Sequence, residues 1–131
     1  MLSNTALSSL YRGYIECLNG QNWAELDRFV DDQVKHNGRS LGLSGYRDML
    51  VRDHAAIPDL QFNIDLLVCE TPHVAARLLF NCTPRGEFLG LRVDGRKICF
   101  AENVFYEFRN VRIMSVWSVI DKAEIEMQLR H

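Results

Sequence analysis

The sequence predicts an α+β protein in which N-terminal helices pack on one face of a strongly curved antiparallel sheet. Apolar residues recur at helical spacing up to residue 57, whereas after residue 60 they alternate with period two. The length of 131 residues, with 47% hydrophobic and 24% charged residues, is typical of one globular domain over residues 1–131. A domain of this size buries a core and leaves room for a pocket.

Three helices are expected in the first half of the chain. Apolar residues at helical spacing predict the first over residues 7–18, with Gly20 as its stop. The second begins at Asn22, which forms with Glu25 the pattern of a capping box. The third covers residues 44–57. It ends there because Pro58 follows, and the residue before a proline disfavours the helical conformation.

The strands follow from β-type alternation and from turn residues between the alternating segments. They are expected at residues 33–37, 62–68, 74–82, 98–108 and 111–120. Residues 84–96 form a glycine-rich loop, and residues 122–128 form a short helical end. A curved sheet closed by helices makes a cone with an apolar interior and one open mouth, which is a natural site for a small molecule.

Charge and composition exclude several classes of partner. With 15 basic and 17 acidic residues the net charge is -2, and no basic stripe is present, so neither nucleic acid nor a membrane surface is an expected partner. No secretory signal or membrane-spanning stretch is recognisable, so a cytoplasmic location is expected. His36, His54 and His73 lack metal-ligand spacing, and we expect no metal site.

Asp121 is the first candidate for chemistry. Strict alternation along the last strand places it at the end of an apolar row with Ile113 and Trp117. If that row lines a cavity, loss of water raises the pKa of the carboxyl group toward the range useful for proton transfer. The alternative is structural, since Asp121 precedes a helical segment and aspartate is a preferred N-cap.

Further candidates share the expected cavity with Asp121. His36, on the early strand, is the second polar group, hydrogen-bonded either to Asp121 or to a substrate carbonyl, and a surface position is the alternative. Trp117 would form a wall that stacks on a planar substrate. The remaining wall candidates are Tyr14, Tyr46, His54, Phe62 and Phe105. The alternative for each aromatic is an ordinary place in the core.

Five short segments carry a resemblance to a known family. They are Ile57-Pro58-Asp59-Leu60, Val74-Ala75-Ala76-Arg77, Gly86-Glu87-Phe88-Leu89-Gly90, Asp94-Gly95-Arg96 and Trp117-x-x-x-Asp121. In order and spacing they resemble the SnoaL-like polyketide cyclases of the NTF2-like superfamily, over nearly the whole chain. The resemblance implies a cone-shaped α+β barrel, no metal or organic cofactor, and a homodimer formed through the sheet.

The resemblance also implies an activity. In characterised members the aspartate at the position of Asp121 is the acid/base in an intramolecular aldol ring closure of a polyketide ester, so the expected partner is a small hydrophobic carbonyl compound. A double-bond isomerase or dehydratase would use the same cone. The chain departs from the family pattern at Pro84, where many relatives have histidine, and at Glu107, where arginine is common. A non-catalytic module that binds a small hydrophobic ligand or dimerises is therefore the second hypothesis.

Overall fold

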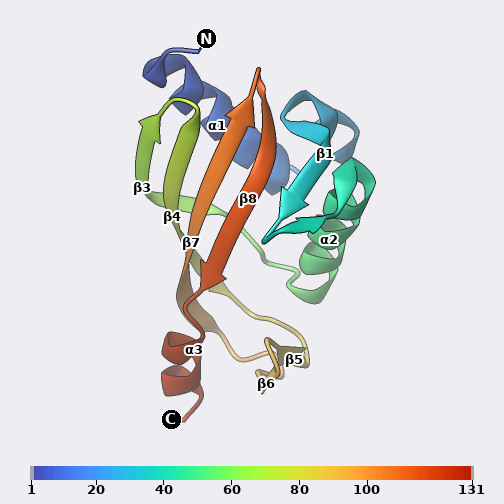
Figure 1. Ribbon diagram of the computed structural model, residues 1–131. Helices are drawn as coiled ribbons and strands as arrows, with labels where there is room; N and C mark the ends of the chain where they lie inside the picture. Colours follow the sequence, from blue (N-terminus) through green and yellow to red (C-terminus); the bar gives the residue numbers. More distant parts are fainter. Residues whose placement is uncertain (1, 131) are drawn as a thin grey trace.

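The structure is a computed structural model that describes residues 2–130. Its helices are α1 (Asn4–Asn19), the 3-10 helix η1 (Trp23–Arg28), α2 (Gly42–Ala56) and α3 (Lys122–Leu129). Its strands are β1 (Val30–His36), β2 (Arg39–Ser40), β3 (Asn63–Glu70), β4 (His73–Cys82), β5 (Glu87–Phe88), β6 (Leu91–Arg92), β7 (Ile98–Arg109) and β8 (Arg112–Ile120). Figure 1 shows α1 behind the long strands and α2 beside β1.

Six strands form one curved sheet in the order β2-β1-β8-β7-β4-β3, and β5 pairs with β6 in a separate small hairpin. The predicted α+β class is confirmed. The sheet is mixed rather than purely antiparallel, because β1 lies beside β8 and runs parallel to it. It is also open rather than closed into a barrel, since β2 and β3 are its two edges. Helices α1 and α2 cover its concave face.

The first helix is close to its prediction, whereas the second differs. Helix α1 is capped by the Ser3 hydroxyl and ends at Gly20, whose backbone N–H binds the carbonyls of Glu16 and Leu18. The predicted capping box at Asn22 is wrong: its side chain makes no cap hydrogen bond, and the turn that follows is a 3-10 helix.

Strand β1 begins three residues earlier than predicted, at Val30. The acidic pair that follows Val30 in the sequence is part of this strand. It lies on the solvent side of the strand or at its border, while Val30 and Val34 are buried in the core. The strand therefore carries His36 at its last position, next to β8.

A β-bulge in β8 decides which side chains enter the interior. On β7, Glu107 pairs with Ser115, but the next residue, Phe108, pairs with Ile113, so β8 contains one extra residue. A bulge reverses the alternation of faces beyond it. Ile113 and Val116 are consequently both buried although they are three residues apart. Beyond the bulge, the even-numbered residues point inward.

The core lies between α1 and the concave face of the sheet. Among its fully buried side chains are Leu7 and Tyr11 from α1, Leu78 from β4 and Ile113 from β8. Burial of such apolar surface is the main stabilising contribution to the fold. Within residues 2–130, no helix combines the length and the apolar composition needed to cross a membrane.

Candidate active site

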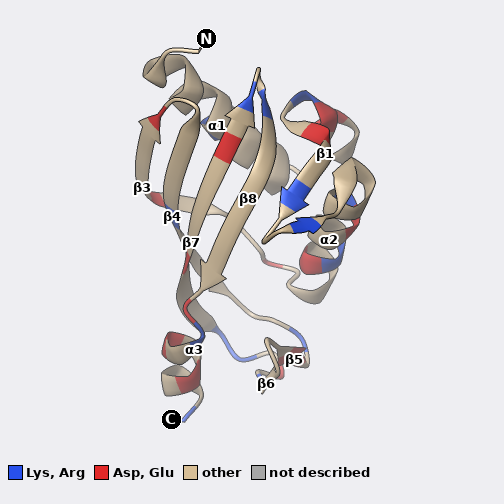
Figure 2. Ribbon diagram, viewed as in Figure 1, with Lys and Arg blue, Asp and Glu red and all other residues tan. Residues whose placement is uncertain are grey.

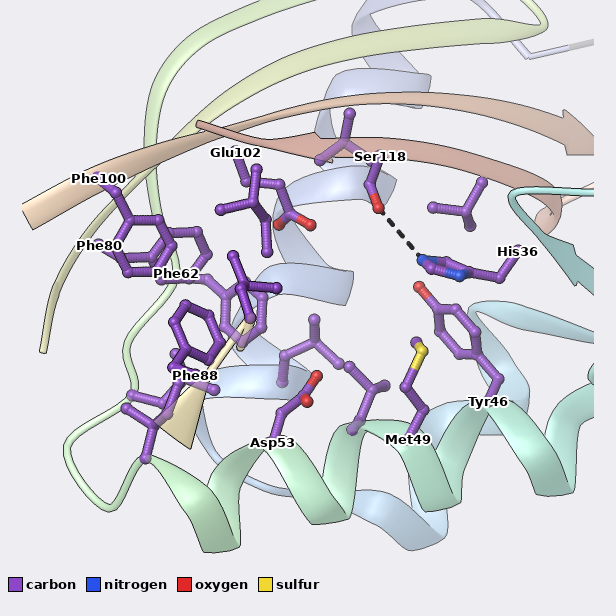
Figure 3. A pocket seen from close by; sticks show the side chains of 18 of the residues that line it. His36, Tyr46, Met49, Asp53, Phe62, Phe80, Phe88, Phe100, Glu102 and Ser118 are labelled. Carbon is purple, nitrogen blue, oxygen red and sulfur yellow. Dashed lines mark hydrogen bonds between the residues drawn. The ribbon is translucent and has the colours of Figure 1, made fainter. Parts of the chain in front are cut away.

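A cavity of about 220 Å³ lies between the concave face of the sheet and helices α1 and α2. Figure 3 shows its side chains converging from α2, β1, β7 and β8 and from the loop that carries Phe88. Most of the wall is aromatic or aliphatic. The polar side chains are few and face one another, which is the usual composition of a small-molecule site.

Glu102 projects from the β7 wall into this cavity. It occupies an otherwise apolar row that contains Phe100, Val104 and Tyr106 at alternate positions of β7. Burial raises the pKa of its carboxyl group to about 7, and the charge of Asp53 adds to this effect. A hydrogen bond with the Ser118 side chain acts in the opposite direction. Near neutral pH this carboxyl group therefore exchanges a proton readily, as an acid/base group must.

Asp53 enters the cavity from the opposite wall. Helical spacing places it on the same face of α2 as Tyr46, Met49 and Leu50, and all four line the cavity. The residue remains accessible to solvent, so it sits at the rim rather than in the depth of the cavity. Partial loss of water still raises the pKa of its carboxyl group to about 6, while the neighbouring Arg52 lowers it. Figure 3 shows Asp53 and Glu102 facing each other.

His36 and Ser118 form the polar end of the cavity. The His36 Nε2 atom and the Ser118 hydroxyl are 3.2 Å apart (Figure 3). Burial, together with the charge of Arg39, lowers the pKa of His36, so the neutral imidazole is favoured. Because a hydroxyl carries one hydrogen, Ser118 can donate it to Glu102 while accepting the Nε2 hydrogen of His36. Such a chain orients the Glu102 carboxylate.

Tyr14, Tyr46 and Tyr106 line the cavity, and Tyr11 packs against Tyr106 behind them. The Tyr14 and Tyr46 hydroxyls are 2.7 Å apart, and the Tyr11 hydroxyl donates to that of Tyr106 at 3.1 Å. Burial raises the pKa of each, and the nearby charge of Glu102 contributes to each shift. These hydroxyls therefore remain protonated and serve as hydrogen-bond donors.

Phenylalanine rings close the other end of the cavity. Phe80 and Phe100 stack at 5.1 Å between ring centroids, Phe62 meets Phe80 edge-on at 5.2 Å, and Phe88 lies 5.5 Å from Phe100. We call these four residues the phenylalanine box. Phe88 belongs to the β5–β6 hairpin, whose flanking Gly86 and inner Gly90 have positive φ angles of 58° and 76°. The hairpin brings Phe88 over the cavity from outside the main sheet.

Four of the residues predicted from the sequence line the cavity. They are His36, Tyr14, Tyr46 and Phe62. His54 is adjacent but does not line it: its ring packs edge-on to Trp23 at 5.3 Å and near Phe62 at 6.2 Å. Only 8% of His54 is exposed, and its Nε2 atom has no hydrogen-bond partner within the described residues. Burial lowers the pKa of this imidazole, which is therefore an uncharged part of the core.

The prediction that Asp121, Trp117 and Phe105 face the cavity is wrong. The bulge in β8 turns Trp117 outward, where 43% of it is exposed, and Phe105 pairs with it on the outer face of the sheet. The Asp121 carboxylate accepts a hydrogen bond from the Glu124 backbone N–H and caps helix α3. Asp121 is therefore a helix N-cap, which is the structural alternative given above.

Sequence reasoning missed Glu102, Asp53 and Ser118 as site residues. A signal for Glu102 was present, because it is the charged residue in the alternating apolar row of β7. Asp53 likewise shares the apolar face of its helix. Ser118 had no signal, because its direction depends on the bulge. Among residues 2–130, no three histidine, cysteine, aspartate or glutamate side chains are placed to hold a metal ion together.

Comparison with known proteins agrees with this architecture. The model of the SnoaL-like polyketide cyclase family matches residues 8–129. The chain belongs to this family. It is 52% identical to a SnoaL-like polyketide cyclase from Agrobacterium tumefaciens strain C58, whose crystal structure matches with a TM-score of 0.94 over 98% of this chain and 99% of that one.

More distant structures share the SnoaL-like fold. TsrD from Streptomyces laurentii is 21% identical, with a TM-score of 0.85 over 98% of each chain. IdmH from Streptomyces antibioticus is 20% identical, with a TM-score of 0.81 over 95% of this chain and 99% of its own. No curated protein matches the chain.

Proposed function

We propose that this protein is an acid/base enzyme that acts on an enolisable carbonyl compound without a cofactor, with Glu102 as the acid/base. The observation that carries the proposal is the Glu102 carboxyl group on an apolar wall, hydrogen-bonded to Ser118 and facing protonated tyrosine hydroxyls. Membership of the SnoaL-like polyketide cyclase family supports a carbonyl substrate and an intramolecular aldol condensation. The catalytic residue proposed for this chain is Glu102 rather than Asp121.

The proposed reaction moves one proton to and from Glu102 and forms one bond between two carbon atoms of the substrate. The Glu102 carboxylate takes a proton from the carbon next to a carbonyl group, and the electron pair of the broken C–H bond forms an enolate. The Tyr46 hydroxyl is the donor proposed to stabilise the enolate oxygen. The enolate carbon then bonds to a second carbonyl carbon of the same molecule. The resulting alkoxide recovers the proton from Glu102, which leaves the enzyme unchanged.

Proton removal can be tested without knowing the natural substrate. We expect the wild-type protein to exchange the acidic carbon-bound hydrogens of small ketones that contain an aromatic ring, such as 2-tetralone, for deuterium in heavy water. The rate should rise with pH to about 7 and then level off, because only the ionised form of Glu102 removes protons. Proton NMR measures the loss of signal. Exchange no faster than in buffer would favour the non-catalytic ligand-binding module instead.

We also propose that the outer face of the sheet forms a homodimer. Two rows of outward side chains cross β3, β4, β7 and β8 in register. They are Val68, Ala75, Phe105 and Trp117 in one row, and Leu66, Arg77, Asn103 and Val119 in the next. Phe105 and Val119 are 60% and 70% exposed. The charged residue of β8 is Arg112 at the start of the strand, and the rest of β8 is uncharged (Figure 2). Apart from Arg77 and Asn103 the side chains of the two rows are apolar, and an exposed apolar patch of this kind marks an interaction site.

Substituting the centre of these rows should separate the subunits. In light scattering, the wild type is expected at twice the chain mass of 15.1 kDa, whereas Phe105→Glu and Val119→Glu are expected at the monomer mass. The reason is that two copies of a buried, unpaired carboxylate meet at a twofold interface. Met127→Glu is the control, because Met127 is also exposed but lies on α3, outside these rows. A monomeric wild type would contradict the proposal.

A further inference from the structure

The charged side chains that line the cavity are acidic. Two carboxyl groups, those of Asp53 and Glu102, line it, while none of the described lining residues is lysine or arginine. The other titratable side chains that line the cavity are Tyr14 from α1, His36 from β1, Tyr46 from α2 and Tyr106 from β7, while Arg52 lies next to Asp53 on α2 but outside the lining. The tyrosines are uncharged, and the pKa of His36 is lowered. Above pH 7 the cavity is therefore negatively charged.

The two acids oppose each other's ionisation. The charge of Asp53 is one cause of the raised pKa of Glu102. Like charges that face each other across a partly buried site repel more strongly than they do in bulk water. A positive charge placed between them would relieve this repulsion, whereas a carboxylate or phosphate group would add a third negative charge.

The aromatic walls also favour a cation. The electron-rich faces of Phe and Tyr rings attract an ammonium group, and the attraction is larger where water is excluded. The phenylalanine box lies on one side of the two carboxyl groups, and Tyr46 lies on the other (Figure 3). An apolar body can therefore occupy the box while a charged group attached to it reaches the carboxyl groups.

We propose that the cavity selects an amine-bearing ligand, whose protonated amino group lies between Asp53 and Glu102 and whose apolar body lies in the phenylalanine box. The inference rests on the proposed function in that the same cavity holds the reacting compound. It narrows the substrate class to small carbonyl compounds that carry an amino group.

The proposed ligand would also prepare the catalytic base. In this arrangement Asp53, at the rim, would pair with the ammonium group, and Glu102, which faces Asp53 across the cavity (Figure 3), would take the proton from the acidic carbon. An adjacent positive charge favours the ionised form of a carboxyl group. Binding of the amine would therefore lower the pKa of Glu102 and keep it unprotonated at neutral pH, ready to accept a proton.

Equilibrium binding of three unreactive probes tests the proposal. They are 2-phenylethylamine, 2-phenylethanol and 3-phenylpropanoate, which share a phenyl ring on a short chain and differ in the charge of the end group. Calorimetry at pH 8 is expected to show the amine binding about tenfold or more tightly than the alcohol, and the carboxylate binding most weakly. The affinity for the amine should fall as pH is lowered from 8 to 5, because Asp53 and Glu102 become protonated.

Two variants and a control make the result specific. Asp53→Asn and Glu102→Gln should each reduce the preference for the amine without weakening the alcohol, whereas Asp48→Asn, an exposed carboxylate on α2 outside the cavity, should not. An amine that binds no more tightly than the alcohol, including the case in which no probe binds, overturns the proposal. A preference for the amine over the alcohol that persists when Asp53→Asn and Glu102→Gln are combined in one protein also overturns it. The proton-exchange assay on ketones is independent, so failure of the ligand class and failure of the catalytic role are separate results.

Discussion

Replacing Glu102 by glutamine is expected to lower the rate of deuterium exchange into an enolisable ketone by about a hundred- to ten-thousand-fold, the usual contribution of a placed acid/base group. Glutamine keeps the size and the hydrogen-bonding ability of the side chain but cannot accept the proton. Initial rates measured by proton NMR at pH 8 give the comparison. Glu107→Gln is the matched control, because Glu107 lies on the same strand but on the outer face, near His73.

The stability of Glu102→Gln shows whether a lower exchange rate is due to loss of the base or to loss of the fold. The pKa of Glu102 is about 7 in the folded state and about 4.5 as a free group, so ionisation costs stability as pH rises through this interval. The penalty is fully present above pH 7 and absent below 4.5. Glu102→Gln should therefore be more stable than the wild type at pH 8, by about 1–3 kcal/mol.

Asp121→Asn distinguishes the two candidate carboxylates. Asparagine is as good an N-cap as aspartate, so the substitution should preserve helix α3 and leave the exchange rate near that of the wild type. A large loss of exchange in Asp121→Asn together with little loss in Glu102→Gln would reject the assignment of Glu102.

Replacing Tyr14 by alanine is expected to lower the free energy of unfolding by about 3–5 kcal/mol, as for other large buried aromatic residues. Only 1% of Tyr14 is exposed, and its ring lies 5.9 Å from Tyr11, 6.0 Å from Tyr106 and 6.4 Å from Phe29. The substitution therefore enlarges the cavity and removes three ring contacts. Urea unfolding at pH 7 measures the change.

Tyr14→Phe is the comparison that isolates the hydroxyl group. It keeps the ring but leaves the Tyr46 hydroxyl without its partner at 2.7 Å, and we expect a loss of about 1–2 kcal/mol. A loss below about 1 kcal/mol for Tyr14→Ala would mean that the site collapses around the missing ring, and the account of a packed tyrosine cluster would be wrong.

Much of the fold could be predicted because periodicity is a local property. Helix α1 and strands β4 and β7 each carry one uninterrupted pattern of apolar residues, and each lies where its pattern placed it. The family resemblance was likewise carried by short local segments, and the match over residues 8–129 confirms it. His36, Tyr14, Tyr46 and Phe62 were correctly placed at the cavity for the same reason.

The wrong face predicted for Trp117 has a clear physical cause, which is a change of register. The bulges in β3 and β8 each insert one residue, and side chains beyond a bulge change face. As a result, Trp117 is exposed, although simple alternation placed it in the apolar row with Ile113. A bulge depends on how two strands pair, so nothing in the single sequence of β8 reveals it.

The sequence alone determined the fold class, the apolar faces of the helices and the presence of one acid in the apolar row of β7, because each of these follows from a local pattern. The pairing of β8 with β7 selects which carboxylate matters, because it sends Ser118 inward beside Glu102 and leaves Asp121 as a helix cap. The packing of α2 against the sheet then brings Asp53 opposite Glu102. The alternation of side chains along a strand is a local property that can be read from neighbouring residues. Burial, the interaction between charges and a raised pKa depend on contacts between segments far apart in the chain, so the tertiary structure alone determines them.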